Sequence, residues 1–320
     1  MAYPMFDRSQ LQLRPLAERV HDFTRNEMLS PGDAQPAMAS AALDAFVERV
    51  VAAHKRGAPL ILMHGGHVVK QGLGRLVIDL MERGIVQHVA MNGSGPIHEY
   101  ELALIGATTE SVARYITAGQ FGLWQETGRL NDVAAEAARA GIGLGEAFGR
   151  FIAESGLPYS ADSILAAGWR LRVPVTVHVG IGQDIIHEHP NCDGAAYGAA
   201  SYTDFLVFTQ SLAQLQGGAL LAVSSHVMAP EVFLKSLAMV RNVARQRGEQ
   251  INRFATAVFD LPDLGADPSV EAARDSAEYF FRPYKTLLVR TVADGGESFY
   301  VRGQYRDTFA AFHQRVIAAL

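Results

Sequence analysis

The sequence predicts an α/β fold built on an open, mostly parallel sheet of about six strands. Short runs rich in Val, Ile and Leu recur along the chain, and each is followed by a polar turn and then by a stretch with helical spacing. This repetition of strand, turn and helix is typical of parallel sheets whose strands are joined by crossover helices. The predicted strands are Pro59–Met63, Val86–Met91, Val173–Val179, Ala219–Val223, Phe254–Phe259 and Thr286–Thr291.

Helices are predicted before and between these strands. Ser40–Arg56 has apolar residues at the spacing of an amphipathic helix. Further helices are expected over Val68–Arg83, from near Ile97, over Tyr197–Leu215 and over Pro230–Arg247, where proline suits the first turn. Residues 1–39 predict a helical N-terminal arm. Residues 40–320 predict a single Rossmann-like domain, with a strand-free, alanine-rich helical insertion around 108–169.

Composition narrows the class of protein. The 320 residues are 49% hydrophobic and 19% charged, which fits a globular chain, and the formal net charge is -5. Nucleic-acid binding is not expected, because that needs a concentrated basic face. No apolar run reaches the length of about 18 residues that spans a bilayer, so no membrane partner is expected. The N-terminus lacks the apolar segment of a secretory signal, and Cys192 is the only cysteine. A cytoplasmic enzyme is the expectation.

Histidines mark one edge of the predicted sheet. Seven of the eleven histidines fall at or after the ends of predicted strands: His64, His67, His98, His178, His187, His189 and His226. In open parallel sheets, ligands bind outside the carboxyl ends of the strands. The histidines therefore predict a functional site at that edge.

Two small-residue turns predict a cofactor site there. Gly65, Gly66 and His67 follow the first strand, and Asn92, Gly93, Ser94 and Gly95 follow the second. Small residues before a helix allow backbone N–H groups to approach a phosphate, which the helix dipole also favours. His98 and Glu99 come in the first turn of the next helix, and we expect them to contact substrate and to act in catalysis, respectively.

The loop after the third strand carries the densest group of ionisable residues. Asp184 could pair with a substrate amine while His187 or His189 acts as acid or base. Alternatively, these three residues could bind a metal ion, or the histidines could only hold the loop together. His226, after the fourth strand, is a further catalytic candidate. A serine-hydrolase triad is not expected, because the chain has no G-x-S-x-G turn.

Two stretches resemble deoxyhypusine synthase. GGHVVKQGLGRLVIDLMERGIVQHVAMNGSGPIHEYELALIG, at Gly65–Gly106, has that family's order of strand, turn, helix, strand and turn, and VPVTVHVGIGQDIIHEHP is the second match. The resemblance implies the family's fold, a nicotinamide dinucleotide near Asn92, Gly93 and Ser94, an amine held by Asp184, and a homotetramer. The family's lysine motif is absent: Ser276 stands at the lysine position, and Lys285 lies nine residues further on.

These observations lead to one main hypothesis. The chain is expected to be an NAD-dependent oxidoreductase or transferase that removes a hydride at an amine-bearing carbon of a small amine or amino acid, without being a true deoxyhypusine synthase. The alternatives are a metal-dependent hydrolase or lyase built on His187, His189 and Asp184, and a catalytically inactive binding protein of the same fold.

Overall fold

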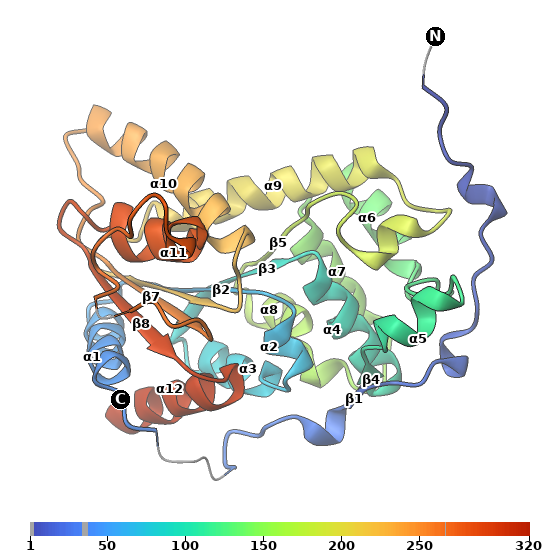
Figure 1. The fold of residues 1–320 in the computed structure, drawn as a ribbon, viewed down its shortest axis with the longest axis horizontal. Helices are drawn as coiled ribbons and strands as arrows, with labels where there is room; N and C mark the ends of the chain where they lie inside the picture. The colour runs from blue at the N-terminus through green and yellow to red at the C-terminus, as the bar shows by residue number, and fades with distance from the viewer. Residues whose placement is uncertain (1–2, 34–37, 266) are drawn as a thin grey trace.

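A six-stranded parallel sheet forms the centre of the protein in the computed structural model, which describes residues 3–33, 38–265 and 267–320 (Figure 1). The strand order is β5-β3-β2-β6-β7-β8. The chain thus winds outward from β2 to one side and then from β6 to the other, so the order reverses between β2 and β6. The strands are β2 Leu60–His64, β3 Val86–Asn92, β5 Val175–His178, β6 Ala219–Val223, β7 Ala255–Asp260 and β8 Glu297–Arg302.

Helices cover both faces of the sheet. Alternate residues of β2 face opposite cores: Leu60 and Leu62 join one apolar cluster, and Ile61 and Met63 join the other. The first face carries α1 Ala41–Lys55, α2 His67–Lys70, α3 Gly74–Glu82, α4 Ser94–Ile105, α8 Ile164–Leu171 and α12 Tyr305–Ala319, and the second carries α9 Gly194–Leu212 and α10 Met228–Gln246 (Figure 1). The predicted fold class is confirmed.

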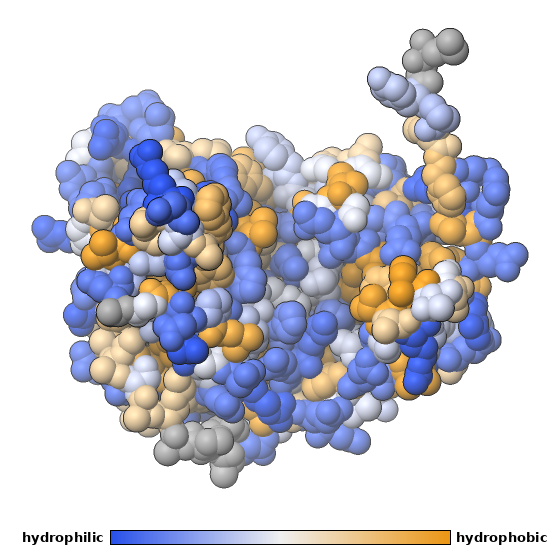
Figure 2. All heavy atoms as spheres, in the orientation of Figure 1, coloured by the Kyte–Doolittle hydropathy of each residue, from blue (hydrophilic) through white to orange (hydrophobic). Residues whose placement is uncertain are grey.

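The predicted helical insertion is present. It comprises α5 Val112–Thr117, α6 Arg129–Ala140, α7 Leu144–Glu154 and α8, and it follows the short strand β4 Ala107–Thr108. On the mostly hydrophilic face seen in Figure 2, the region of α5 presents a hydrophobic group, in which Val112 is 55% and Ile116 is 60% exposed.

The N-terminal arm differs from the predicted helix. Its described part contains three short 3-10 turns, Arg8–Gln10, Leu16–Glu18 and Arg25–Glu27, and the two-residue strand β1 Phe23–Thr24, which pairs with β4. Backbone hydrogen bonds of Arg14 with Leu123 and Gln125 also hold the arm against the insertion. Backbone groups of the arm therefore form hydrogen bonds with another segment of the chain, where a helix would have formed them within the arm. Residues 1, 2 and 34–37 of the predicted arm lie outside the described residues.

The sixth predicted strand is wrong. Thr286–Thr291 lies mostly in a π-helical segment, Tyr284–Arg290, and the sixth strand is β8. Leu287 and Leu288 are fully enclosed in the core of the α10 face, so this short apolar run marks a buried helical turn, which periodicity alone does not distinguish from a strand. β8 pairs only with β7 at the edge of the sheet and is mostly half-exposed, which explains its weak apolar signal. Within the described residues, no helix is long and apolar enough to cross a membrane.

Candidate active site

Two adjoining cavities lie at the carboxyl edge of the sheet. The larger, about 360 Å³, opens at the reversal point between β2 and β6, and the smaller, about 170 Å³, lies beneath the N-terminal arm and α4. Gln183 and Asp184 line both cavities. The larger cavity is also lined by Gly65, Asn92, Gly93, His178, Ser224, Ser225 and His226, and the smaller by Arg19, Lys70, Ser94, His98, Glu101 and Glu110.

Asp184 is the carboxylate that the two cavities share. Its side chain lies against the backbone of Gly93, where a Cβ atom would come within 2.1 Å of Asp184 Oδ2. Glycine is therefore required for the β5–α9 loop to approach the start of α4 this closely. Burial raises the pKa of Asp184 to about 6, and no cation among the described residues offsets that effect. Among the described residues this carboxylate thus has no cationic partner, although it accepts a hydrogen bond from the backbone of His187.

Gly65 and Gly66, in the turn after β2, allow the ends of neighbouring strands to pack closely. A Cβ atom on Gly65 would come within 2.1 Å of the Ser224 carbonyl oxygen, and one on Gly66 within 2.5 Å of Ser94 Oγ. These glycines let the ends of β2, β3 and β6 approach one another around the cavities. His67 is exposed, and its ring lies 6.0 Å from that of Tyr305.

The second turn begins α4. Gly93 is the N-cap residue of this helix, and Ser94 Oγ donates a hydrogen bond of 2.9 Å to Asn92 Oδ1. Asn92 and Gly93 line the larger cavity, whereas Gly95 packs against Met91. The orphan backbone N–H groups at the start of α4 therefore lie beside the larger cavity.

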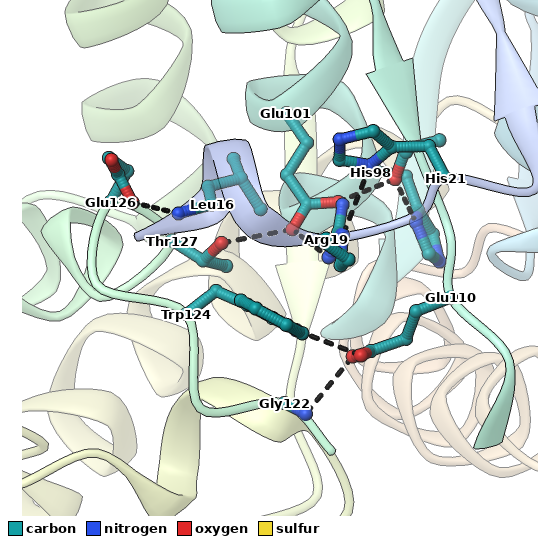
Figure 3. A network of polar contacts seen from close by, with 11 residues as sticks. Leu16, Arg19, His21, His98, Glu101, Glu110, Gly122, Trp124, Glu126 and Thr127 are labelled. Carbon is teal, nitrogen blue, oxygen red and sulfur yellow. Dashed lines mark hydrogen bonds and ion pairs between the residues drawn. The ribbon is translucent and has the colours of Figure 1, made fainter. Parts of the chain in front are cut away.

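A buried ion pair forms one wall of the smaller cavity (Figure 3). The guanidinium of Arg19, from the arm, donates to both oxygens of Glu101 at 2.8 and 2.6 Å, and both side chains are about 1% exposed. Thr127 and Thr108 also donate to this carboxylate. Burial alone would raise the pKa of Glu101. The Arg19 guanidinium and the Thr108 hydroxyl, which both donate to this carboxylate, hold its pKa below the usual value. Glu101 is therefore fully paired, in contrast to Asp184.

The same network fixes the tautomer of His98. Because Thr108 donates its hydroxyl proton to Glu101 at 2.7 Å, it must accept from His98 Nδ1, which lies 2.8 Å away. The Nε2 atom of His98 is then an unprotonated acceptor. Burial lowers the pKa of His98 to about 4, so the ring is neutral at pH 7. His98 thus offers a neutral hydrogen-bond acceptor in the smaller cavity.

Three of the predicted catalytic residues lie away from both cavities. His187 Nδ1 accepts from the backbone N–H groups of Gly182 and Asp184 at 3.2 Å, which holds the loop in shape. His189 is fully buried, and its Nε2 lies 2.8 Å from the Gly122 carbonyl. Glu99 accepts from Ser163 and from the backbone N–H of Leu165, at the start of α8.

His226 lies in the larger cavity and has a carboxylate partner. Its Nε2 is 2.8 Å from Oδ2 of Asp260, the last residue of β7, and Tyr305 donates to the other oxygen of Asp260 at 2.7 Å. The hydrogen bond and charge of Asp260 raise the pKa of His226. Sequence reasoning did not select Asp260, although it follows the predicted strand Phe254–Phe259 directly.

The predicted metal ligands do not converge. Among the described residues, no three His, Cys, Asp or Glu side chains are arranged to hold a metal ion, so Asp184, His187 and His189 do not form such a group. Lys285 lies in the π-helical segment with its ammonium 3.8 Å from the centre of the Tyr279 ring, and it lines neither cavity.

Comparison with known proteins supports the fold. The chain matches no protein-family model and no curated protein sequence. Among solved structures, ArgZ, an arginine dihydrolase from the ornithine–ammonia cycle in cyanobacteria, aligns with a TM-score of 0.50 and 11% identity over 89% of this chain. The aligned part is 32% of ArgZ, so this chain spans about a third of that protein. At this identity the likeness concerns the fold.

Two further solved structures match at lower scores. A ternary complex of AgrE with ornithine and NAD+ has a TM-score of 0.47 and 13% identity, over 88% of this chain and 34% of AgrE. A putative deoxyhypusine synthase from Entamoeba histolytica has a TM-score of 0.46 and 7% identity, over 88% of this chain and 90% of that chain. A deoxyhypusine synthase-like structure is thus among the structural neighbours of this chain.

Proposed function

We propose that this chain is an NAD-dependent enzyme that removes a hydride from the amine-bearing carbon of a small amine or amino acid. The larger cavity would hold the cofactor and the smaller one the substrate. The observation that carries the proposal is the position of Asp184, whose partly buried carboxylate lies where the two cavities meet. A substrate ammonium bound there would place its carbon next to the cofactor cavity.

The residues of the larger cavity suit a dinucleotide. The cavity lies where the strand order reverses, which is the usual place for a dinucleotide in a doubly wound sheet. Two long helices, α4 and α10, begin beside it, and their N-termini favour phosphate. His226 uses Nε2 for Asp260, and in the protonated ring, which the Asp260 carboxylate favours by raising the pKa of His226, Nδ1 would donate to a phosphate oxygen. NAD bound there would supply the hydride acceptor.

The residues of the smaller cavity suit an amino acid. Asp184 would pair with the substrate ammonium, and His98 Nε2 would accept a second hydrogen bond from it. Lys70 lines the same cavity and could hold a carboxylate. Ile97, Val112, Phe121 and Ile185 supply apolar surface for a short side chain. In this proposal His187, His189 and Glu99 hold the surrounding loops and helices in place and do not touch substrate.

Substitution of Asp184 tests the substrate site. Asp184→Asn keeps the shape of the side chain and removes its charge, and Glu188→Gln, in the same loop but lining neither cavity, is the matched control. Calorimetry with L-alanine, L-lysine, L-ornithine and putrescine should show binding of at least one of them to the wild-type chain and to Glu188→Gln. Loss of a charge-assisted contact of about 2–5 kcal/mol should abolish that binding in Asp184→Asn. Equal affinity in all three proteins would refute the proposed role of Asp184.

A second pair of variants tests the cofactor site. Val227 is 63% exposed at the edge of the larger cavity, and Val243 is 45% exposed on α10 and lines neither cavity. Val227→Trp should weaken NAD binding by blocking the cavity, whereas Val243→Trp should not. Absence of NAD binding to the wild-type chain would refute the cofactor assignment. Binding of NAD and an amine without formation of NADH would favour the inactive binding protein.

A further inference from the structure

A continuous row of polar side chains leaves the larger cavity and runs through the core beneath α9. His178, at the end of β5, lines the cavity, and its Nε2 lies 3.0 Å from Thr176 Oγ1. The same hydroxyl lies 2.9 Å from Nε2 of His88 on β3, and His88 Nδ1 lies 2.8 Å from Ser211 Oγ on α9. Ser211 is half-exposed, whereas His88 and Thr176 are only 1% exposed.

The sheet geometry explains how this row forms. Ala90 of β3 pairs with Thr176 of β5, so His88, Thr176 and His178 project from the same face of the sheet. That face otherwise carries the apolar core formed with α9 and α10. The ring of Phe208, on α9, packs edge-on against both imidazoles, with centroid distances of 5.3 and 5.5 Å. The rings are therefore held in one orientation.

Burial of these groups is unfavourable for folding unless every one is hydrogen-bonded. Desolvation lowers the pKa of both His88 and His178 to about 3, so both rings are neutral at pH 7. Apolar side chains would fill the same space without this cost. The neighbouring position Ala90, which faces the same core, shows that the sheet does not need polar residues there.

We propose that these four side chains form a proton relay between the larger cavity and the surface at Ser211, and that His178 is the base that takes the substrate proton. This inference rests on the proposed function, which supplies an amine as the proton source and NAD as the hydride acceptor. His178 would accept the proton at Nδ1, because its Nε2 is bonded to Thr176. Asp184 lines both cavities and would hold the ammonium where they meet, at the end of the cavity that His178 lines.

The chemistry balances along this row. The substrate ammonium would give one proton to His178 Nδ1 while the Nε2 proton of that ring passes to Thr176, the Thr176 hydroxyl proton to His88 Nε2 and the His88 Nδ1 proton to Ser211, which would return one to water. Because these transfers occur together, neither buried ring would become charged. The nitrogen lone pair would then form the C=N bond as the carbon gives up its hydride, for which NAD would be the acceptor. The products are an iminium, NADH and one proton delivered to solvent.

The single hydroxyl proton of Thr176 imposes a constraint that can be measured. This hydroxyl donates to one imidazole and must accept from the other, so His88 and His178 must hold opposite tautomers. In the resting relay, His178 is protonated at Nε2 and His88 at Nδ1. ¹⁵N NMR of histidine-labelled protein at pH 7 should show this pair. Two identical tautomers, or the reverse pair, would overturn the relay without affecting the proposed binding sites.

Kinetics test whether the row carries protons. NADH formation should be followed by stopped flow, with an amine from the panel above. Thr176→Val, which keeps the shape of the side chain, should slow NADH formation at least tenfold and leave NAD and amine affinities unchanged, and Thr176→Ser should restore the rate. Ser211→Ala, at the half-exposed end of the row, should slow the reaction less and reduce the solvent deuterium isotope effect.

The outcomes separate this inference from the proposed function. An unchanged rate and isotope effect in Thr176→Val would overturn the relay and leave the proposed function intact. A wild-type chain that binds neither NAD nor an amine would overturn the proposed function. If the chain binds NAD and an amine but forms no NADH, both the proposed hydride transfer and the proposed proton relay are refuted.

Discussion

Replacement of Asp184 by asparagine should stabilise the protein in the absence of ligand. The folded chain raises the pKa of this carboxyl from 3.8 to about 6, and burial is the cause. At about 1.4 kcal/mol per pKa unit, charging Asp184 in the folded state costs roughly 3 kcal/mol. Because the side chain is only partly buried, we reduce this figure to about 1–2 kcal/mol. Asparagine has the same shape and avoids the cost.

The size of this stabilisation depends on pH. The folded protein keeps the Asp184 proton to a higher pH than the unfolded chain does, so the cost is absent below 3.8, grows as the pH rises, and is complete above about 6. Asp184→Asn should therefore unfold roughly 1.5–3 °C higher than wild type at pH 8. The difference should disappear near pH 4.

Thermal denaturation at the two pH values measures this effect. Asp275→Asn, at an exposed position, should change the unfolding temperature little at either pH. A lower unfolding temperature for Asp184→Asn at pH 8, or an equal gain at pH 4 and pH 8, would refute the reasoning. The gain in stability should accompany the loss of amine binding, as expected where a functional site carries an unpaired charge.

Three further predictions follow from the same geometry. Calorimetry between pH 5 and 8 should show amine affinity falling about tenfold per pH unit below pH 6, since the cation binds the ionised form of Asp184, and a flat profile would contradict this. Gly93→Ala should weaken amine binding, because its Cβ atom would displace the Asp184 carboxylate, whereas Gly194→Ala, where nothing lies within 4 Å, should not. Arg19→Leu should lower the free energy of unfolding in urea by about 3–5 kcal/mol, because it leaves Glu101 buried without its cation, and adding Glu101→Leu should recover part of that loss.

The sequence pattern predicted five of the six strands of the sheet. The sixth strand, β8, was missed for a local reason. Five predicted strands match β2, β3, β5, β6 and β7, because a strand buried on both faces is apolar at nearly every position. β8 pairs on one side only and exposes several side chains, so the apolar run in its sequence, Glu297–Arg302, is only the three residues Phe299, Tyr300 and Val301 between polar residues. The more apolar segment Thr286–Thr291 was therefore predicted in its place.

The location of the candidate site could be predicted, but the direction of each side chain could not. Parallel strands bring their carboxyl ends to one edge, and Asp184 and His226 do line a cavity there. His187 and His189 are two residues apart around a 3-10 turn, Ile185–Glu188, whose three-residue period turns the two rings in different directions. The sequence pattern H-x-H contains no information about that turn.

The residues that sequence reasoning missed fall into two groups. Arg19 is 82 residues from its partner Glu101 and comes from an arm without regular structure, so no local pattern relates the two. His88 and Thr176, in contrast, lie inside predicted strands where burial on both faces favours apolar side chains. A polar residue within such a run must find a buried partner, and two such residues on neighbouring strands can supply each other's partners. Polar interruptions in buried strands on neighbouring positions therefore predict side chains that are hydrogen-bonded to each other inside the core.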